Sequence, residues 1–359
     1  MASSSVGSSV PNNNDHHDLL MLDRFHRWMA FHDRSYPNDD EKLHRFEVYR
    51  HNIEYIERTN RDGGLGYQLG ENDFTDLTSE EFAARYIGGL TADDSKVITS
   101  LAGDVSEGYV ADGGEDDIDP AKLQIAPPSS VNWLLAGAVT PAKSQGRCGS
   151  CWIFAAVATV ESMHQIATGE LVDLSEQQVL DCDDDLDQYG CKGGQEKDAL
   201  LWIKKKFGIV TEVTYPYKAR SLHIIPECRY NFAKNARRVG RMSTVMEVYP
   251  AGSEAALTTA VARQPVAVGI EANANMQFYN NTSGIYTGPC GTKLNHAVVV
   301  VGYGRDNVNG VDYWIVKNSW GSDWGQDGFF LMRKGADGPN GLCGIVRESG
   351  VYPIAWKTS

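Results

Sequence analysis

Seven cysteines constrain this chain more than any other feature, because every one of them follows residue 147. Disulfides join cysteines in pairs, so an odd number leaves one thiol that is either intermolecular or reactive. Disulfides also require an oxidising compartment, so we expect the secretory pathway, leading to the vacuole, the lysosome or the extracellular space. We hold this expectation although the N-terminus, "MASSSVGSSVPNNNDHHD", lacks the apolar run of a leader. The cysteines are Cys148, Cys151, Cys182, Cys191, Cys228, Cys290 and Cys343.

Length and charge exclude several classes of protein. At 359 residues the chain is long enough for two or three folding units. No run approaches the roughly 18 to 20 apolar residues of a membrane span, so we expect none. The net charge is −14, but residues 88–126 hold nine Asp and Glu against two Lys, so half of the excess lies in one low-complexity segment. No basic patch appears elsewhere to follow phosphates, which disfavours nucleic-acid binding.

The first part of the chain is predicted to be a small helical unit. Apolar residues recur at steps of three and four from Leu19 to Asn60. Pro37 and Asn38 separate two helices, and the pair Gly63 and Gly64 ends the second. We therefore divide the chain into a disordered N-terminus at 1–17, a helical unit at 18–87, an acidic flexible linker at 88–126 and a main domain at 127–359.

The main domain is predicted to be α+β, with helices first and strands later. The stretch from Cys151 to Thr168 lacks Pro and Gly, and its small apolar residues favour a buried helix. Later runs bounded by Gly and Pro are typical of strands: "PVAVGIEA", "HAVVVVGYG", "DYWIVKN" and "GFFLMRK".

The stretch "QGRCGSCWIF" raises the question of which thiol is unpaired. A zinc site would need about four ligands, and Cys148-x-x-Cys151 has no second such pair, so we expect no metal. A redox pair would leave the other five cysteines unexplained. Cys151 is the best candidate for a nucleophile, because Ser150 can cap the helix that begins there and place the sulfur at the positive end of the helix dipole. That position favours the thiolate.

A thiolate that attacks a carbonyl also needs a proton donor for the leaving group. The main domain offers three histidines. His164 lies on the same helix as Cys151, about 20 Å away at 1.5 Å per residue. His223 has no obvious orienting partner. His296 begins an apolar run in which a strand can hold its ring, so it is the predicted base.

The stretch "VKNSWGSDWG" supplies a group that can orient the imidazole. Asn318 can accept a hydrogen bond from the ring N–H, and Trp320 is close enough in sequence to exclude water. Together with "QGRCGSCW" and "LNHAVVVVGYG", this stretch resembles the papain family of cysteine proteases in order and in spacing.

The helical unit is similar to the inhibitory propeptide of the cathepsin L-like branch of that family, so the resemblance covers nearly the whole chain. "GENDFTD" matches a second propeptide motif with Gly70, Asn72, Phe74 and Asp76. The interspersed helix motif is matched by Glu41, Arg45, Val48, Asn52, Ile56 and Asn60, with Tyr49 in place of the usual Phe.

The resemblance implies a fold of two lobes, one helical and one β-barrel-like, preceded by the propeptide. It makes Cys151 the nucleophile, His296 the proton carrier and Asn318 its orienter. Gln145 would donate to the oxyanion together with the Cys151 backbone N–H. No cofactor is implied. The implied disulfides are Cys148–Cys191, Cys182–Cys228 and Cys290–Cys343, which leave Cys151 unpaired.

The resemblance also implies a set of substrate-binding residues. In most relatives the main specificity pocket is apolar, but here Glu196 replaces an apolar residue and Glu348 would lie at the pocket floor. We therefore predict that this pocket accepts Arg and Lys beside aliphatic side chains. The alternative is that both glutamates face solvent. Two departures from the family, Ile153 and Ala155, put the packing behind the nucleophile in question. The implied residues are Gly193, Gly194, Gln195, Glu196, Gly269, Leu294, Ala297, Trp320 and Glu348.

The favoured function is a cysteine endopeptidase zymogen that works through an acyl-thioenzyme at acidic pH. The alternatives are a non-catalytic inhibitor or binding protein, and an acyltransferase, which would normally carry Asp in place of Asn318. Protonation of propeptide carboxylates, Asp76 among them, is predicted to loosen the propeptide and to expose a junction near Ala126 and Pro127. Expected partners are protein or peptide substrates, the propeptide itself and cystatin-like inhibitors, and we expect a monomer.

Overall fold

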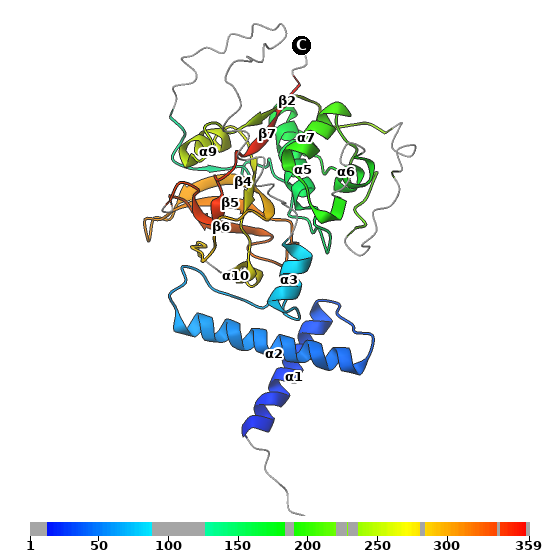
Figure 1. Cartoon of the computed structure of the whole chain (residues 1–359), viewed down its shortest axis with the longest axis vertical. Helices are drawn as coiled ribbons and strands as arrows, with labels where there is room; N and C mark the ends of the chain where they lie inside the picture. The colour runs from blue at the N-terminus through cyan, green and yellow to red at the C-terminus, as the bar shows by residue number, and fades with distance from the viewer. Residues whose placement is uncertain are drawn as a thin grey trace, which may run out of the picture.

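The computed structural model describes residues 13–87, 126–183, 190–219, 228, 236–280, 284–335 and 338–356. Most of the acidic segment at 88–126, and His223, lie outside these described residues. Figure 1 shows the N-terminal helices below a larger body that has helices on one side and a sheet on the other. Among the described helices, none combines the length and the apolar character that crossing a bilayer requires.

The N-terminal unit contains α1 (Asn13–Phe31), α2 (Asp39–Asp62) and α3 (Ser79–Tyr86). The Asn38 side chain caps α2 by accepting from a backbone N–H, and Gly63 follows its last residue at a φ of 68°. The predicted division of the two helices is thus confirmed. The predicted disordered N-terminus is wrong for residues 13–17, which are helical, because backbone hydrogen bonds extend a helix beyond its apolar stripe.

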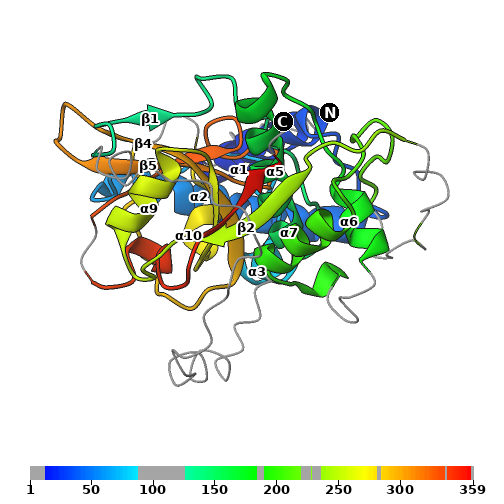
Figure 2. The same ribbon diagram turned by 90° about the horizontal axis from the view of Figure 1, so that it is seen from above.

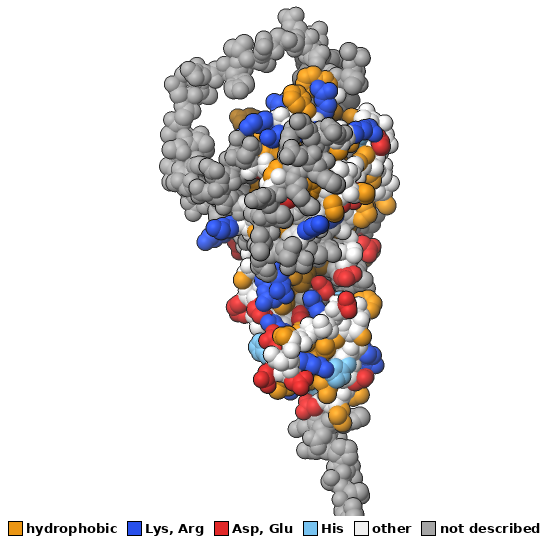
Figure 3. Space-filling view, turned by 90° about the vertical axis from the view of Figure 1, so that its right-hand side faces the viewer, with side chains coloured by type: hydrophobic (Ala, Val, Ile, Leu, Met, Phe, Trp, Pro, Cys, Tyr) orange, Lys and Arg blue, Asp and Glu red, His pale blue; other side chains and the backbone are white. Residues whose placement is uncertain are grey.

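Aromatic rings and side-chain bonds to carbonyls hold this unit together. The ring of Tyr49 lies 5.1 Å from that of Phe25 and 5.4 Å from that of Trp28. Asn52 Nδ2 donates at 2.9 Å to the carbonyls of Thr75 and Leu77, so α2 holds the loop that precedes α3. Figure 3 shows acidic and basic side chains intermingled on one face of the narrow lower part of the molecule.

The helical side of the larger body is built around α5 (Cys151–Thr168), as the sequence predicts. Its residues from Cys151 to Met163 are all buried, and Gly169 follows it in the left-handed conformation. Small side chains allow neighbouring helices to pack closely against it. The other helices here are α6 (Glu176–Cys182), the short 3₁₀ turn η2 (Gly190–Lys192) and α7 (Glu196–Lys205).

The other side is an antiparallel sheet with the strand order β2-β7-β3-β4-β5-β6, in which β1 also pairs with β4. All four predicted strands are present, whereas the sequence missed the two-residue β1, the largely exposed β2 and β7, which contains Pro353. Figure 2 shows from above that α6 and α7 lie on one side and α9, β4 and β5 on the other. The elements are β1 (Val131–Asn132), β2 (Met242–Glu247), α9 (Glu254–Val261), β3 (Val266–Ile270), α10 (Ala274–Gln277), β4 (His296–Arg305), β5 (Asp312–Lys317), β6 (Phe329–Arg333), η3 (Leu342–Gly344) and β7 (Val351–Ala355).

The apolar core is divided unevenly between these parts. One cluster of buried residues runs from Phe25 and Tyr49 in the N-terminal unit through Phe74 and Trp320 to Val300 in the sheet. A second cluster fills the helical side around α5. The N-terminal unit therefore completes the core of the sheet side, and its removal would expose apolar surface there.

Candidate active site

Cys151 is the first residue of α5 and is fully buried. Ser150 occupies the N-cap position, but the prediction that its side chain caps the helix is wrong. Its hydroxyl instead lies 2.8 Å from the Tyr217 hydroxyl, which donates to the Gln145 carbonyl at 2.9 Å. A partner 67 residues away thus competes successfully with the local cap.

His296 is the first residue of β4, as predicted, and is also fully buried. Its Nε2 lies 2.8 Å from Asn318 Oδ1. That same oxygen accepts the Ser319 backbone N–H at 2.8 Å, which fixes the orientation of the Asn318 amide. Because Oδ1 can only accept, Nε2 carries the ring proton and Nδ1 has a free lone pair.

Neighbouring backbone groups place Cys151 beside His296. The Ala297 N–H, one residue along β4, contacts the Cys151 sulfur and favours its ionised form. His296 Nδ1 has no hydrogen-bond partner within the described residues. The structure thus brings together the predicted thiol, histidine and asparagine, and leaves one ring nitrogen available.

Trp320 covers the histidine and contacts the N-terminal unit. Its ring stacks on His296 with centroids 4.8 Å apart. Trp320 also contacts α3: the centroid of the Phe82 ring lies 5.0 Å from that of Trp320 in an edge-to-face arrangement, and Trp320 Nε1 donates to the Tyr86 carbonyl at 3.2 Å. The helical unit is therefore joined to the histidine through a single indole.

Burial decides the protonation states in this closed form. It raises the pKa of the Cys151 thiol to about 12, although the Ala297 N–H acts in the opposite direction. Burial lowers the pKa of His296 to about 4, although the bond to Asn318 raises it. The sequence predicted a thiolate, but the closed form favours a neutral thiol beside a neutral imidazole, because desolvation outweighs the helix dipole.

Gln145 is held in a fixed orientation next to the thiol's helix. Its Nε2 donates to the Cys148 carbonyl at 2.8 Å, and its Oε1 accepts from the Ser319 hydroxyl at 2.6 Å. An amide nitrogen has two hydrogens, so one remains for a further acceptor. The sequence missed Ser319 and Tyr217 as positioning residues; Ser319 lay inside the quoted motif, whereas nothing local marked Tyr217.

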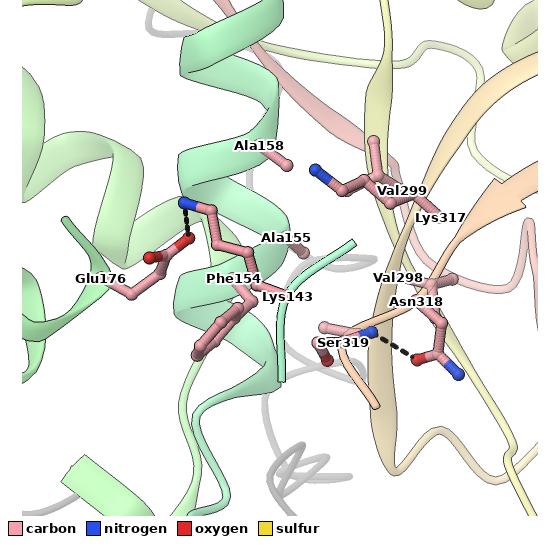
Figure 4. Close-up of a pocket in the computed structure, with 11 residues that line it drawn as sticks. Lys143, Phe154, Ala155, Ala158, Glu176, Val298, Val299, Lys317, Asn318 and Ser319 are labelled. Atoms are coloured by element: carbon pink, nitrogen blue, oxygen red, sulfur yellow. Dashed lines mark hydrogen bonds and ion pairs between the residues drawn. The ribbon is translucent and has the colours of Figure 1, made fainter. Parts of the chain in front are cut away.

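A buried charge cluster, also missed by the sequence reasoning, lies behind the site (Figure 4). Lys143 Nζ contacts Glu161 at 2.9 Å and Glu176 at 2.8 Å. Lys317 Nζ, at the end of β5, donates to Thr140 at 2.7 Å. Burial raises the pKa of Glu176 to about 8, despite Lys143, and lowers that of Lys317 to about 8.

The two departures behind the nucleophile are both buried, Ile153 and Ala155. Ala155 lines a cavity of about 10 Å³ that also touches Glu176, Lys317 and Asn318. This volume is close to the smallest that holds one water molecule. Ala155 thus leaves a small space behind the site, beside the 2.8 Å contact between His296 Nε2 and Asn318 Oδ1.

The predicted substrate-binding residues separate into groups. Trp320 lies on His296, Ala297 contacts the Cys151 sulfur, and Leu294 is in the core of the helical side. Gly193 adopts a φ of 115°, and a Cβ on Gly194 would lie 2.7 Å from the Trp152 ring. One pocket of about 410 Å³ brings together Gln195, Glu196, Gly269 and Glu348.

Three disulfides stabilise the larger body, and the pairing that the resemblance implied is confirmed. They are Cys148–Cys191, Cys182–Cys228 and Cys290–Cys343. Cys151 is buried and unpaired. The first cysteine of "QGRCGSCWIF" therefore forms a disulfide, and the second has an unpaired thiol that can act as a nucleophile.

The N-terminal unit is attached to the body by exchanged hydrogen bonds at α10. Asn72 Nδ2 donates to the Gln277 carbonyl at 2.7 Å. Gln277 Nε2 returns bonds of 3.0 Å to the carbonyls of Phe74 and Leu77. Gly70 is required here, because a Cβ would lie 2.1 Å from the Asn280 side chain. The sequence predicted Gly70, Asn72 and Phe74 but missed Gln277.

Comparisons with known proteins agree with this geometry. Residues 127–354 match the family described as "Papain family cysteine protease", and residues 25–82 match "Cathepsin propeptide inhibitor domain (I29)". Ananain of Ananas comosus is 40% identical over 93% of this chain and 88% of its own length. Fruit bromelain of the same plant is 42% identical over 91% of this chain and 84% of its own length.

A solved structure, "Recombinant stem bromelain precursor", is 40% identical, covers 94% of this chain and 100% of its own, and has a TM-score of 0.78. The N-terminal helical unit accordingly corresponds to a propeptide that inhibits the enzyme from which it is later released. The chain belongs to the papain family of cysteine proteases and is the proenzyme of a cysteine endopeptidase.

Proposed function

We propose that Cys151 is the nucleophile, His296 the proton carrier and Asn318 the residue that orients it. One observation supports this most strongly: Asn318 Oδ1 accepts from both Ser319 N–H and His296 Nε2, each at 2.8 Å. The second bond leaves Nδ1 as the only ring nitrogen that can accept the thiol proton.

The reaction follows from these assignments. The thiol proton moves to His296 Nδ1, and the sulfur bonds to the substrate carbonyl carbon while the C=O electron pair moves to oxygen. Collapse breaks the C–N bond, and Nδ1 gives its proton to the leaving amine. Water then attacks the thioester and loses a proton to Nδ1; the C–S bond breaks and the thiol re-forms with that proton.

Gln145 is proposed to stabilise the negative oxygen that forms in both steps. Its Nε2 already donates one hydrogen to Cys148, and Ser319 holds its oxygen, so the second hydrogen has a set direction. The Cys151 backbone N–H would be the other donor. Fixed donors of this kind need no reorganisation during the reaction.

Acidic activation is proposed to act through Glu81 rather than Asp76. Burial raises the pKa of Asp76, so protonation favours the closed form and the sign is opposite to the sequence prediction. Arg45 lowers the pKa of Glu81 to about 2. Ionised Glu81 therefore stabilises the folded propeptide at pH values above 4.5, the ordinary pKa of a glutamate. This contribution is lost as the pH falls towards 2.

Three further proposals follow from the resemblance and the chemistry. Processing near Ala126 and Pro127 would release the propeptide at the boundary where the peptidase match begins. Three disulfides support passage through the secretory pathway to the vacuole, the lysosome or the extracellular space. We also propose a monomer that is open to cystatin-like inhibitors once the propeptide has left.

Alkylation tests the assignment of the nucleophile. Iodoacetamide at limiting concentration should inactivate the activated chain in proportion to label at Cys151, measured by peptide mass. The proenzyme should react much more slowly, because its thiol is buried and its pKa is raised to about 12. Activity that survives full labelling of Cys151 would refute the proposal, whereas transfer to an added amine in preference to water would favour an acyltransferase.

A further inference from the structure

We propose that a surface patch at the end of α7 binds an acidic polysaccharide through the carboxylates on its sugar rings. The inference goes beyond the proposed function, because the patch lies outside the candidate active site and its binding needs no cleavage. We call this surface the basic patch, and it consists of Lys204, Lys205, Lys206, Phe207, Arg237, Arg238, Arg241 and Trp356.

Contacts between distant segments bring the residues of the basic patch together. Lys206 follows the last residue of α7, and its carbonyl accepts a hydrogen bond from the Arg238 guanidinium. The Arg241 guanidinium lies over the rings of Phe207, at 5.6 Å, and Trp356, at 5.2 Å. The Trp356 backbone N–H donates to the Arg241 carbonyl at 3.1 Å. The expectation that the chain has no basic patch is therefore wrong, because the fold assembles one from three segments.

This surface is positively charged on a chain whose net charge is −14. Residues 204–241 hold ten Lys and Arg against two Glu, so their formal charge is +8. Arg237 pairs with Glu170 at 3.5 Å, and both side chains are more than half exposed. Within the described residues the Arg241 guanidinium makes the two ring contacts and forms no hydrogen bond or ion pair. The basic patch therefore attracts an anion and has donors to bind it.

Arg241 is held in a form that suits a carboxylate. Contact with two rings restricts its guanidinium, so less side-chain entropy is lost when an anion binds. The N–H donors of a guanidinium form a fork that matches the two oxygens of a carboxylate. Phe207 is 63% exposed and Trp356 is 50% exposed, so apolar ring surface remains open beside this fork. A sugar acid offers a carboxylate for Arg241 and the C–H groups of its ring for the aromatic side chains.

The compartment favours an acidic polysaccharide over other anionic partners. Three disulfides support the secretory location proposed above. Anionic lipids are concentrated on the cytoplasmic leaflet of membranes, which a chain in that location does not meet. A polysaccharide with a carboxylate on each sugar presents charges at regular intervals, so several cations of the basic patch can bind it at once.

The basic patch is accessible while the propeptide is bound. The first residue of α7, Glu196, lines the pocket of predicted substrate residues, and the helix ends ten residues later, about 15 Å along its axis. Figure 1 shows α7, β2 and β7 in the upper part of the larger body, with the propeptide helices below it. Figure 3 shows basic side chains beside apolar ones at the upper end of the molecule. A bound polysaccharide would therefore leave the active site open and hold the protein before and after activation.

Retention on immobilised polygalacturonate tests the proposal, with the full chain carrying Cys151→Ala so that it does not process itself. This chain should be retained at about 50 mM salt and released by about 300 mM salt, because salt screens ion pairs between exposed charges. Methyl-esterified polygalacturonate keeps the sugar rings but lacks the negative charges. It should bind at least about 10-fold more weakly.

Variants locate the binding surface. Arg241→Gln in the same chain should raise the Kd for polygalacturonate by about 5- to 20-fold. The double change Lys204→Gln and Lys205→Gln should raise it by about 10-fold. The matched control is Arg263→Gln, which removes the same charge from an exposed side chain just after α9 and should leave the Kd unchanged.

Equal retention on the free and the esterified polymer would overturn the proposal, and so would an equal Kd for Arg241→Gln and Arg263→Gln. Should Arg241→Gln fail to fold, an unchanged Kd in the double lysine variant would overturn it instead. Vesicles that contain phosphatidylserine and a single-stranded oligonucleotide probe the other anionic partners. Binding to either of these without binding to polygalacturonate would show that the partner is not a polysaccharide.

Discussion

The propeptide and the peptidase domain share one cluster of buried apolar residues but are stabilised in different ways. The peptidase has three disulfides and a buried charge cluster around Lys143. The propeptide has no cysteine, and the ion pair of Arg45 with Glu81 that stabilises it is partly open to solvent. The difference teaches that the propeptide is held by noncovalent contacts, which a change of pH or cleavage of the chain can break. The disulfides of the peptidase domain are not broken by either change.

The point of contact between the two regions repeats this contrast. On the peptidase side, Trp320 is fixed against His296 in a buried stack. On the propeptide side it contacts the rings of Phe82 and Phe74 and donates to the Tyr86 carbonyl. Release of the propeptide would remove these contacts and admit water to the thiol and imidazole, whose pKa values would then move back towards their ordinary range.

The largest effect is expected from Cys151→Ala, which asks whether the peptidase removes its own propeptide. Activity should fall by roughly 10⁴-fold or more, because the attacking atom is lost. Intact mass after mildly acidic incubation should show the unmutated chain losing about its first 126 residues, while the variant stays whole. Equal processing of both chains would mean that another protease makes the cut.

Replacement of both Cys290 and Cys343 by Ser tests whether disulfides stabilise the peptidase domain. The bridge spans 53 residues, and its loss should cost about 2 to 4 kcal/mol of unfolding free energy. We expect the melting temperature of the proenzyme to fall by roughly 5 to 15 °C. Addition of dithiothreitol to the unmutated chain is the control and should lower it at least as far. An unchanged melting temperature would contradict the role given to this disulfide.

A smaller effect is expected from Glu81→Gln, which removes the charge that Arg45 binds. Gln still serves in the capping box of α3, so the helix should persist. The loss of about 1 to 2 kcal/mol should speed propeptide release near neutral pH by about 5- to 30-fold. It should also flatten the pH dependence of release between 4.5 and 2, the range set by Glu81.

Processing rates measured by gel across this pH range would check the prediction. Glu80→Gln is the matched control, since Glu80 is exposed and precedes Glu81 on the same helix. Equal rates for the two variants would mean that the ion pair with Arg45 does not hold the propeptide.

The smallest effect is expected from Ala155→Ser inside the peptidase. The new hydroxyl would enter the small cavity beside Glu176, whose Oε2 has no partner among the described residues. We expect stabilisation of up to about 1 kcal/mol, measured by thermal melting, and kcat/KM unchanged within about twofold. Ala158→Ser, which faces the same cavity, is the control. A large loss of activity would show that Asn318 depends on this packing.

Local patterns in the sequence determined the main elements and the principal site residues of this protein. The helix at Cys151, the strand at His296 and the unpaired thiol all follow from periodicity and from an odd cysteine count. The motifs then predicted Asn318 and Gln145, because each stands in a short stretch that resembles a known family.

Only the tertiary structure decided how these groups are held and ionised. The Ser150 hydroxyl binds Tyr217 instead of capping its own helix, and Ser319 holds Gln145 across 174 residues. No local pattern marks Tyr217, and the motif that contains Ser319 does not indicate that its hydroxyl binds Gln145. Burial likewise favours the neutral thiol of Cys151 in the closed form, where the sequence predicted a thiolate. Hydrogen-bond partners and desolvation depend on which distant surfaces meet, and periodicity in sequence carries no information about that.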